Sequence, residues 1–179
     1  MPNVYFISDL HIYHTNLNNN LRKMSNEDHW NLLKKNWNNK VKSPKDTVYI
    51  LGDLTMDKPE YLYYLNELNG IKILIGGNHD TKRICNLFNG SAVMGCCEYK
   101  GYILSHIPVH KTETNRRRGN IHGHIHKYHL PNFKYINVCS DLNNYTPLTL
   151  DEIIKKQKEK KKFFNKIKLI IKFIKHEFL

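Results

Sequence analysis

Short apolar runs alternate with amphipathic segments through the first half of the chain. Residues 4–7, 47–51 and 71–75 are largely apolar runs of the length of a buried strand. Between the first two runs, Trp30, Leu33 and Trp37 recur at helical spacing, and a second helical pattern over residues 59–68 ends at Asn69-Gly70. Strand, helix and strand at such short intervals predict a parallel α/β core.

The second half of the chain is richer in strand patterns. Residues 102–105, 120–122 and 135–139 predict three more strands, which would form a second sheet facing the first. Beyond residue 150 the pattern becomes that of a lysine-rich amphipathic helix, with apolar side chains every three or four positions: Phe163, Ile167, Ile170, Ile174 and Phe178. We therefore divide the chain into a domain over residues 1–150 and a basic C-terminal helix over residues 151–179.

Five short polar blocks lie at or just beyond these predicted strands. Since the carboxyl ends of parallel strands share one edge of a sheet, the blocks should converge there. Imidazole, carboxylate and amide groups together suit Mn²⁺, Fe²⁺ or Zn²⁺. The blocks supply more ligands than one tetrahedral ion needs, which predicts a two-metal site. The potential ligands are Asp9, His11, Asp53, Asn78, His106, His124 and His126.

The order and chemistry of the blocks resemble the calcineurin-like metallophosphoesterase superfamily, in particular its small single-domain members of phage or viral type. The resemblance covers roughly residues 3–150 and implies a four-layer α/β/β/α sandwich with the metals at one edge. It implies one metal on Asp9, His11, Asp53 and His126, and a second on Asp53, Asn78, His106 and His124, with Asp53 bridging. Mn²⁺ is the favoured ion, with Fe²⁺, Zn²⁺ and Ni²⁺ as alternatives.

The resemblance gives His79 a different role from that of the neighbouring ligand Asn78. In the family this histidine faces the substrate, where it would protonate the leaving oxygen or stabilise charge in the transition state. Asp80 is expected either to orient His79 through a hydrogen bond or to cap a helix, and both alternatives stay open. His79 and Asp80 are therefore the predicted catalytic residues.

Two further groups of residues are candidates for substrate contact. His14 and Asn16 follow the first block at the spacing of the phage-type subgroup, and by that resemblance would line the substrate pocket. The second group, Arg116, Arg117 and Arg118, could reach a second phosphate or a phosphodiester backbone. The alternative for both groups is an ordinary solvated loop.

The function predicted from these residues is hydrolysis of a phosphoester by a metal-activated water. A phosphodiester such as a nucleotide or cyclic nucleotide is favoured, because a leaving alcohol gains most from an acid such as His79. The alternatives are a phosphomonoesterase or protein phosphatase, and a binding scaffold of the same fold without catalysis. A scaffold should lack some ligands or the histidine, and here each of them is present.

The net charge of +12 is unevenly distributed. Residues 151–179 hold ten lysines against four acidic residues, and so carry half of the excess. We expect this helix to pack on the domain or on a second copy of the chain, to attach to an anionic membrane surface, or to bind nucleic acid or another polyanion, and the sequence leaves these open. Apolar runs are too short for a transmembrane helix and the four cysteines lack C-x-x-C spacing. A cytoplasmic location is expected, in the host cytoplasm if the source is viral.

Overall fold

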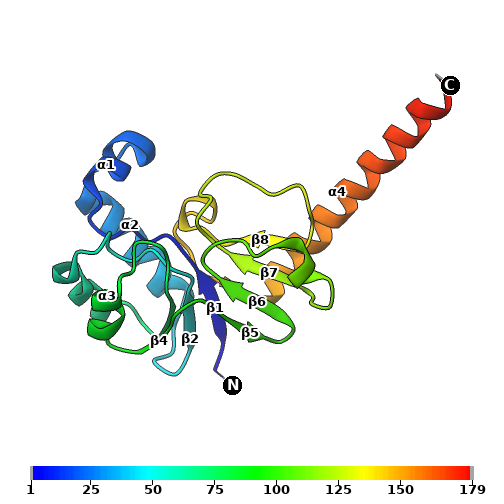
Figure 1. The fold of residues 1–179 in the computed structure, drawn as a ribbon. Helices are drawn as coiled ribbons and strands as arrows, with labels where there is room; N and C mark the ends of the chain where they lie inside the picture. The colour runs from blue at the N-terminus through cyan, green and yellow to red at the C-terminus, as the bar shows by residue number, and fades with distance from the viewer. Residues whose placement is uncertain (1, 178–179) are drawn as a thin grey trace.

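The computed structural model describes residues 2–177 and the side chains of residues 2–171. Two β-sheets lie between helices (Figure 1). The elements follow in the order β1 (Val4–Ile7), α1 (Thr15–Leu17), π-helix η1 (Asn18–Arg22), α2 (Asn26–Lys40), β2 (Thr47–Ile50), 3-10 helix η2 (Pro59–Glu67), β3 (Ile71–Ile75), α3 (Lys82–Leu87), β4 (Ser91–Val93), β5 (Cys96–Tyr99), β6 (Tyr102–Ser105), 3-10 helix η3 (Lys111–Thr114), β7 (Gly119–His122), β8 (Tyr135–Asn137), 3-10 helix η4 (Ser140–Leu142), β9 (Leu148–Thr149) and α4 (Leu150–Glu177).

The first sheet has the strand order β4-β3-β2-β1-β9. Strands β1 to β4 run parallel and β9 pairs antiparallel with β1. Strand β1 is buried on both faces because its side chains alternate between two cores. Tyr5 and Ile7 point to the core beneath the helices, whereas Phe6 points to the core between the sheets. This double burial explains the continuous apolar runs that predicted the parallel strands.

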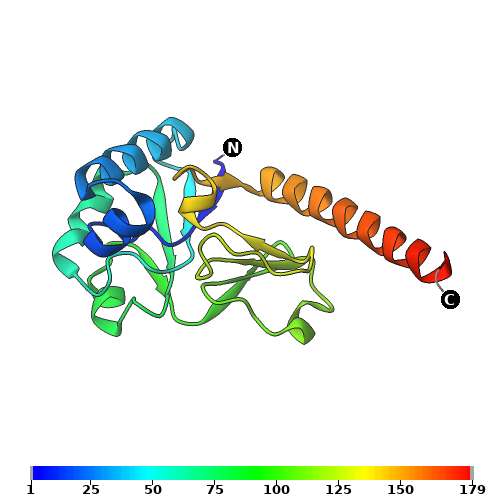
Figure 2. The same ribbon diagram turned by 90° about the horizontal axis from the view of Figure 1, so that it is seen from above.

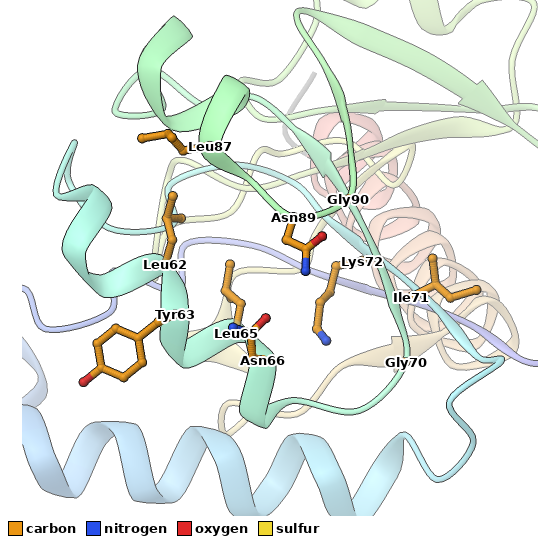
Figure 3. A pocket seen from close by; sticks show the side chains of 10 residues that line it. All are labelled: Leu62, Tyr63, Leu65, Asn66, Gly70, Ile71, Lys72, Leu87, Asn89 and Gly90. Carbon is orange, nitrogen blue, oxygen red and sulfur yellow. The ribbon is translucent and has the colours of Figure 1, made fainter.

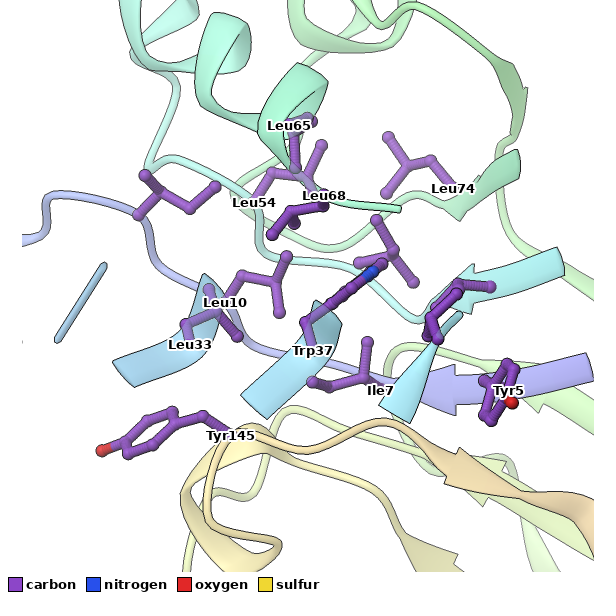
Figure 4. Close-up of a cluster of buried hydrophobic side chains, with 14 of the residues drawn as sticks. Tyr5, Ile7, Leu10, Leu33, Trp37, Leu54, Leu65, Leu68, Leu74 and Tyr145 are labelled. Carbon is purple, nitrogen blue, oxygen red and sulfur yellow. The ribbon is translucent and has the colours of Figure 1, made fainter. Parts of the chain in front are cut away.

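Helices α2, η2 and α3 cover the outer face of the first sheet (Figures 1 and 2). Ser25 caps the first turn of α2, because its hydroxyl oxygen accepts a hydrogen bond from the Asp28 amide at 3.0 Å. The apolar face of α2 then buries Trp30, Leu33 and Trp37 against the sheet. Figure 4 shows Leu33 and Trp37 in this core. The helical spacing in the sequence therefore predicted this layer.

The second sheet has the order β5-β6-β7-β8, with β6, β7 and β8 parallel and β5 antiparallel to β6. It packs against the first sheet through a shared core that includes Phe6, Leu104 and Ile121. A bridge between Ser8 and Cys139 joins the ends of β1 and the segment after β8. The predicted second sheet and the four-layer arrangement are confirmed.

The C-terminal helix α4 packs on the sheets only in its first turns. Ile153 is fully buried in the core between the sheets, and the Gln157 side-chain oxygen accepts a hydrogen bond from the Tyr102 hydroxyl at 2.7 Å. Farther along, α4 extends away from the rest of the chain (Figures 1 and 2). The division of the chain at residue 150 stays a prediction, since the start of α4 shares the core of the preceding domain. No helix within residues 2–177 is long and apolar enough to cross a membrane.

Several short elements were absent from the sequence prediction. They are α3, β4, β5 and β9, together with α1 and η1, which lie in a polar, Asn-rich stretch between β1 and α2. The predicted helix over residues 59–68 is a 3-10 helix over Pro59–Glu67, although it buries Leu65 and Leu68 as expected. Elements of two to six residues are too short for a hydrophobic period to reveal them, and contacts distant in sequence stabilise them instead.

Candidate metal centre

The five polar blocks meet at one edge of the two sheets. Asp9 and His11 follow β1, Asp53 follows β2 and Asn78 follows β3. His106 follows β6 of the second sheet, and His124 and His126 follow β7. All of these strands run parallel within their sheets, so their carboxyl ends bring the seven predicted ligands together.

Strained backbone marks the same edge. Most non-glycine residues avoid positive φ angles, because the Cβ atom then crowds the backbone. Five of the predicted ligands nevertheless have a positive φ: Asp9 (57°), His11 (45°), Asp53 (57°), His124 (69°) and His126 (42°). Such conformations cost about 1–3 kcal/mol each and persist where the surrounding structure fixes them. Seven other described non-glycine residues also have a positive φ, and three of them, Tyr13, Met56 and Asp57, lie in the loops that follow the first two ligand blocks. The strain therefore marks these loops as well as the ligands.

A first group of side chains consists of Asp9, His11 and His126. The His11 and His126 rings stack with centroids 5.3 Å apart, and the His11 Nε2 lies 4.0 Å from the Asp9 Oδ1. His11 is buried, and within the described residues neither of its ring nitrogens has a hydrogen-bond partner. Because unpaired buried nitrogens are costly, this pair of orphaned atoms fits a site built to bind a cation.

A second group consists of Asn78, His106 and His124. The Asn78 Oδ1 lies 2.9 Å from the His106 Nε2 and 3.0 Å from the His124 Nδ1. The two histidine nitrogens are 3.3 Å apart. The other nitrogen of His106, Nδ1, lies 2.8 Å from the Leu51 carbonyl oxygen, which can fix the ring orientation. Three potential donors therefore surround one point.

Asp53 lies between the two groups. Its Oδ2 is 3.7 Å from the His11 Nε2 and 3.3 Å from the His106 Nε2, and Asp9, Asp53 and His106 offer ligand atoms within 4.8 Å of one another. Packing against Asp53 is tight, because a Cβ atom on Gly77 would lie 2.3 Å from its Oδ1. Asp9 also lies near both groups, but Asp53 makes the shorter contacts, with a carboxylate oxygen within 3.7 Å of a histidine nitrogen from each.

The protonation states suit metal binding. Burial lowers the pKa of His11 to about 3, which leaves a neutral imidazole with a free lone pair. Burial alone would raise the pKa of Asp53, but the hydrogen bond with His106 and the charge of that ring outweigh it and hold the pKa below its ordinary value. The hydrogen bond to Asp141 raises the pKa of His126 and orients its Nδ1 toward that carboxylate, so a cation at Nε2 would have to displace a proton from a ring that is more basic than usual.

Asp80 takes neither of the two roles predicted for it. Its buried carboxylate accepts hydrogen bonds from three backbone amides, those of Asp53 (2.7 Å), Leu54 (2.9 Å) and Gly77 (2.9 Å). None of the hydrogen bonds that the described structure gives to Asp80 involves the His79 ring, and Thr81 is the N-cap of α3. Asp80 therefore ties the Asp53 loop to the Asn78 loop.

His79 lies beside the junction of the two groups. Its backbone amide donates a hydrogen bond to the Asp53 Oδ1 at 3.1 Å, and its ring centroid is 6.1 Å from that of His11. The side chain is half-buried and follows Asn78 directly. This position allows the imidazole to face a substrate above the ligands, as the sequence predicted, without placing it among them.

Two residues that support the first group, Arg22 and Asp141, were not predicted from the sequence. Asp141 lies 2.9 Å from the His126 Nδ1, and its other oxygen accepts a hydrogen bond from the Arg22 Nε at 2.7 Å. The buried Arg22 also donates to the Asp9 carbonyl oxygen at 3.0 Å and to the Leu10 carbonyl oxygen at 3.2 Å. Arg22 and His126 hold the pKa of Asp141 well below its ordinary value despite its burial. Sequence reasoning had no local motif by which to find them.

Cys139 is a second unexpected neighbour of the first group. Its sulfur and ligand atoms of Asp9 and His126 lie within 4.8 Å of one another, although the cysteines showed no metal-binding spacing. The Sγ donates to the Asp141 Oδ2 at 3.5 Å. Burial and the nearby carboxylates raise the pKa of this thiol well above its usual value, which favours the protonated form over a ligating thiolate.

The predicted substrate residues divide between the two edges of the sheets. The half-buried His14 lies with its ring centroid 5.6 Å from that of His11, so it belongs to the site, whereas Asn16 is exposed on α1. Arg117 and Arg118 lie at the opposite edge. There Arg117 forms an ion pair with Glu98 at 3.0 Å, and the Arg118 guanidinium lies over the Tyr102 ring.

The prediction that Arg116, Arg117 and Arg118 contact the substrate stays a prediction, and their position in the fold argues against it. They precede β7, whereas the ligands follow it, and a strand of four residues separates the two ends by roughly 13 Å. Proximity in sequence to the last two metal blocks was misleading, because the chain crosses the whole sheet between the arginines and His124.

Two cavities differ in their relation to the centre. A cleft of about 410 Å³ opens beside the second group and is lined by Asn78 and His106 together with Cys96, Ile107, Pro108 and Val109. Figure 3 shows another pocket, of about 330 Å³, between η2, the start of β3 and the segment after α3. It lies at the amino end of β3, away from the ligands, and its only charged lining residue is Lys72.

The layered fold and its metal-binding edge define the class of a metal-dependent phosphoester hydrolase. Over residues 2–170 the chain matches the family described as calcineurin-like phosphoesterase, and it belongs to this family. The resemblance inferred from the five blocks is confirmed, and the match extends beyond residue 150 into α4.

The chain is also similar to individual proteins. The chain is 38% identical over 169 residues to an uncharacterized protein of Methanocaldococcus jannaschii, covering 87% of this chain and 91% of that one. The crystal structure of the protein of unknown function AQ665 from Aquifex aeolicus superposes with a TM-score of 0.65 and 30% identity, over 87% of this chain and 99% of that one. The Gene 66 protein of Mycobacterium phage L5 is 40% identical over 86 residues, covering 45% of this chain and 41% of that protein.

Proposed function

We propose that the protein is a dinuclear phosphodiesterase whose two metal positions share Asp53. The first position would take Asp9, His11, Asp53 and His126, and the second would take Asp53, Asn78, His106 and His124. The carboxylate of Asp53, within 3.7 Å of a nitrogen from each group, carries this proposal. Mn²⁺ is the ion we favour, since the donors mix imidazole with carboxylate and amide oxygen; Fe²⁺, Zn²⁺ and Ni²⁺ are the alternatives.

The chain holds these donors ready before any ion binds. Strained backbone, the Asp80 hydrogen bonds to the Asp53 and Gly77 loops, and the Arg22–Asp141 pair fix ligands from separate strands. When bound, two divalent ions neutralise phosphoryl oxygens and lower the pKa of water at the site. The protein's contribution is thus the spacing and orientation of the ligands, which need little rearrangement on binding.

His79 would supply the proton that the leaving alkoxide requires. The half-buried imidazole follows Asn78 and lies beside Asp53, so a phosphoester spanning the two groups would present its leaving oxygen near this ring. General acid assistance of this kind is typically worth about 10²–10⁴-fold in rate. An alkoxide is a poor leaving group, so a diester benefits from His79 more than an ester of an acidic phenol does. This dependence is the reason for favouring a diester.

The cleft beside the second group would accept the organic part of the substrate. Its volume of about 410 Å³ is of the size of small-molecule sites, and Ile107, Pro108 and Val109 give it an apolar wall. No acidic or basic side chain other than His106 lines it. A neutral group such as a nucleoside fits these surroundings, and we propose a nucleotide or cyclic nucleotide as the substrate class.

Replacement of Asp53 by asparagine tests the dinuclear proposal. We expect the metal content of the Mn²⁺-reconstituted protein to fall from two equivalents, and the rate on a model diester to fall on the order of 10²-fold or more. Circular dichroism controls for folding, and replacement of the exposed Asp57 by asparagine serves as a matched charge control. A fixed content of one ion in the native protein, or normal turnover of Asp53→Asn, would contradict the shared-carboxylate arrangement.

The remaining alternatives make different predictions. A phosphomonoesterase or protein phosphatase would prefer monoesters over diesters when both are offered with Mn²⁺. A non-catalytic scaffold would bind two ions without turnover, but nothing is missing from the predicted ligand set, and His79 is in place. We propose the cytoplasm as the compartment, because all four cysteines are free and Cys139 is a buried thiol.

A further inference from the structure

An apolar stripe leaves the protein core along α4 and becomes exposed. On one side of this helix, Ile153 is fully buried, Phe164 is half-buried and Ile171 is 48% exposed. These positions recur at helical spacing, so the buried face of the first turns continues into the exposed half. Phe163, at 60% exposed, and Ile170, at 49%, widen the stripe. Figures 1 and 2 show the helix projecting from the rest of the chain. Its projecting half therefore presents apolar side chains that no other part of the described structure covers.

Lysines flank this stripe. From residue 155 to residue 171 the helix carries eight lysines and a single acidic residue, Glu159. Lys161 and Lys168 lie on one flank of the stripe by helical spacing, Lys166 lies on the other, and all three are exposed. A helix with an apolar face and a lysine-rich polar face is the pattern of segments that lie in the interface of a membrane.

The stripe also runs into a basic, largely apolar groove at the base of the projecting half. This groove has a volume of about 590 Å³ and is lined by Phe163 and Phe164 of α4 and by Leu130 and Ile136 of the second sheet region. Lys156 and Lys160 stand at the same groove, and the Lys160 ammonium donates a hydrogen bond to the Tyr135 carbonyl oxygen at 2.9 Å. Apolar surface and positive charge are thus continuous from the groove onto the helix.

The distribution of charge along α4 distinguishes three possible occupants of the stripe: a second copy of the chain, a nucleic acid and an anionic bilayer. A second copy paired along the stripe would bring lysine flanks together with only Glu159 to offset their repulsion. A nucleic acid would match the lysines but leave the apolar stripe in water. An anionic bilayer satisfies both features, since acyl chains cover the apolar face while headgroups pair with lysines. We propose that α4 docks the enzyme on an anionic membrane surface.

Vesicle sedimentation of the full-length protein tests this assignment. We expect binding to vesicles of phosphatidylcholine mixed with phosphatidylserine, and about tenfold or more weaker binding to phosphatidylcholine alone. Ile170→Asp combined with Ile171→Asp should abolish binding, because both side chains belong to the stripe. Replacement of Lys161, Lys166 and Lys168 by glutamine should weaken it about tenfold or more.

A matched variant separates local charge from net charge. Replacement of Lys35, Lys42 and Lys45, which are exposed elsewhere, removes the same charge and should leave vesicle binding within about twofold. Hydrolysis of a small soluble diester should be unchanged in every variant, so failure of docking is distinguishable from failure of the active site. Equal loss in both lysine triples would overturn the proposal. So would a light-scattering dimer that the aspartate variant converts to monomer, or binding to heparin with no binding to vesicles.

Discussion

The two groups of ligands differ in how the chain supports them. Behind the first group, Arg22 and Asp141 form a buried network that reaches the His126 ring and the backbone of Asp9. The second group is supported by the contact of the His106 Nδ1 with a carbonyl oxygen and by the Asp80 hydrogen bond to the Gly77 amide, but no side chain in the described structure supports the His124 ring in the way that Asp141 supports His126, and Asn78 is exposed. It borders the open cleft proposed for the substrate. The first position is therefore the more rigid, and the second is the more accessible.

This difference indicates a division of labour within one site. A ligand held by a buried hydrogen-bonded partner binds its ion in a fixed orientation. A ligand at the rim of a cleft can adjust when substrate enters. We expect the first ion to bind more tightly and the second to bind more weakly, with Asp53 coupling the two.

The largest expected effect is on His79, which belongs to neither group. His79→Ala should keep both ions and lose about 10²–10⁴-fold in kcat on a diester with a poor leaving group. Esters of acidic phenols should lose much less, because their leaving oxygen needs no proton. Metal analysis and kinetics on the two ester types give the answer. Loss of an ion from this variant would make His79 a ligand and remove the distinction drawn here.

Next in size is the effect of removing the support of the first group. Asp141→Asn should weaken the tighter Mn²⁺ binding step about 10–100-fold, because His126 loses its orienting carboxylate and Arg22 loses its ionic partner. The weaker step should change little. Isothermal titration of the metal-free protein resolves the two steps, and Asn143→Ala, on the same loop, is the control. Equal weakening of both Mn²⁺ binding steps would contradict the assignment of Asp141 to the first group alone.

A smaller effect concerns acid stability of the metal-free protein. Burial lowers the pKa of His29 to about 3, and its Nε2 accepts a hydrogen bond from the Arg22 Nη1 at 2.8 Å; Asp141, which opposes this shift, and the Tyr145 ring also face it. The unfolded chain, with a pKa near 6.5, therefore binds the proton first, so stability falls as the pH drops from about 6.5 toward 3.

The slope from this one residue is at most about 1.4 kcal/mol per pH unit. His29→Gln keeps an acceptor for Arg22 and should flatten that part of the profile of unfolding free energy against pH. Urea titrations between about pH 4 and about pH 7 measure the change in slope over most of the range in which His29 contributes. An unchanged slope in the variant would mean that His29 does not carry it.

The smallest effect is expected from Arg116, Arg117 and Arg118. Their replacement by glutamine should leave kcat/KM on a small diester within about twofold, because they lie at the edge opposite both ligand groups. The same assay on His14→Ala, whose ring lies beside His11, provides the comparison. A substantial loss of kcat/KM in the arginine variant, with none in His14→Ala, would indicate that the arginines contact the substrate.

Much of the fold could be predicted from the sequence because the information is local. The strands β1, β2 and β3 appear as apolar runs, and α2 appears as a helical period in Trp30, Leu33 and Trp37. The ligands could be found because each follows a strand end, and parallel strands bring such ends together. The family resemblance then supplied roles for the blocks, and the match over residues 2–170 confirms the family.

What only the tertiary structure decided concerns partners that are far apart in the chain. Arg22 and Asp141 are 119 residues apart, so no motif could join them. Asp80 binds backbone amides 26 and 27 residues away, a role that no side-chain pattern announces. The three arginines are close in sequence to His124 but lie at the opposite edge, because strand β7 separates them from it. Sequence determined which chemical groups the chain possesses; the packing of two sheets determined which of them meet.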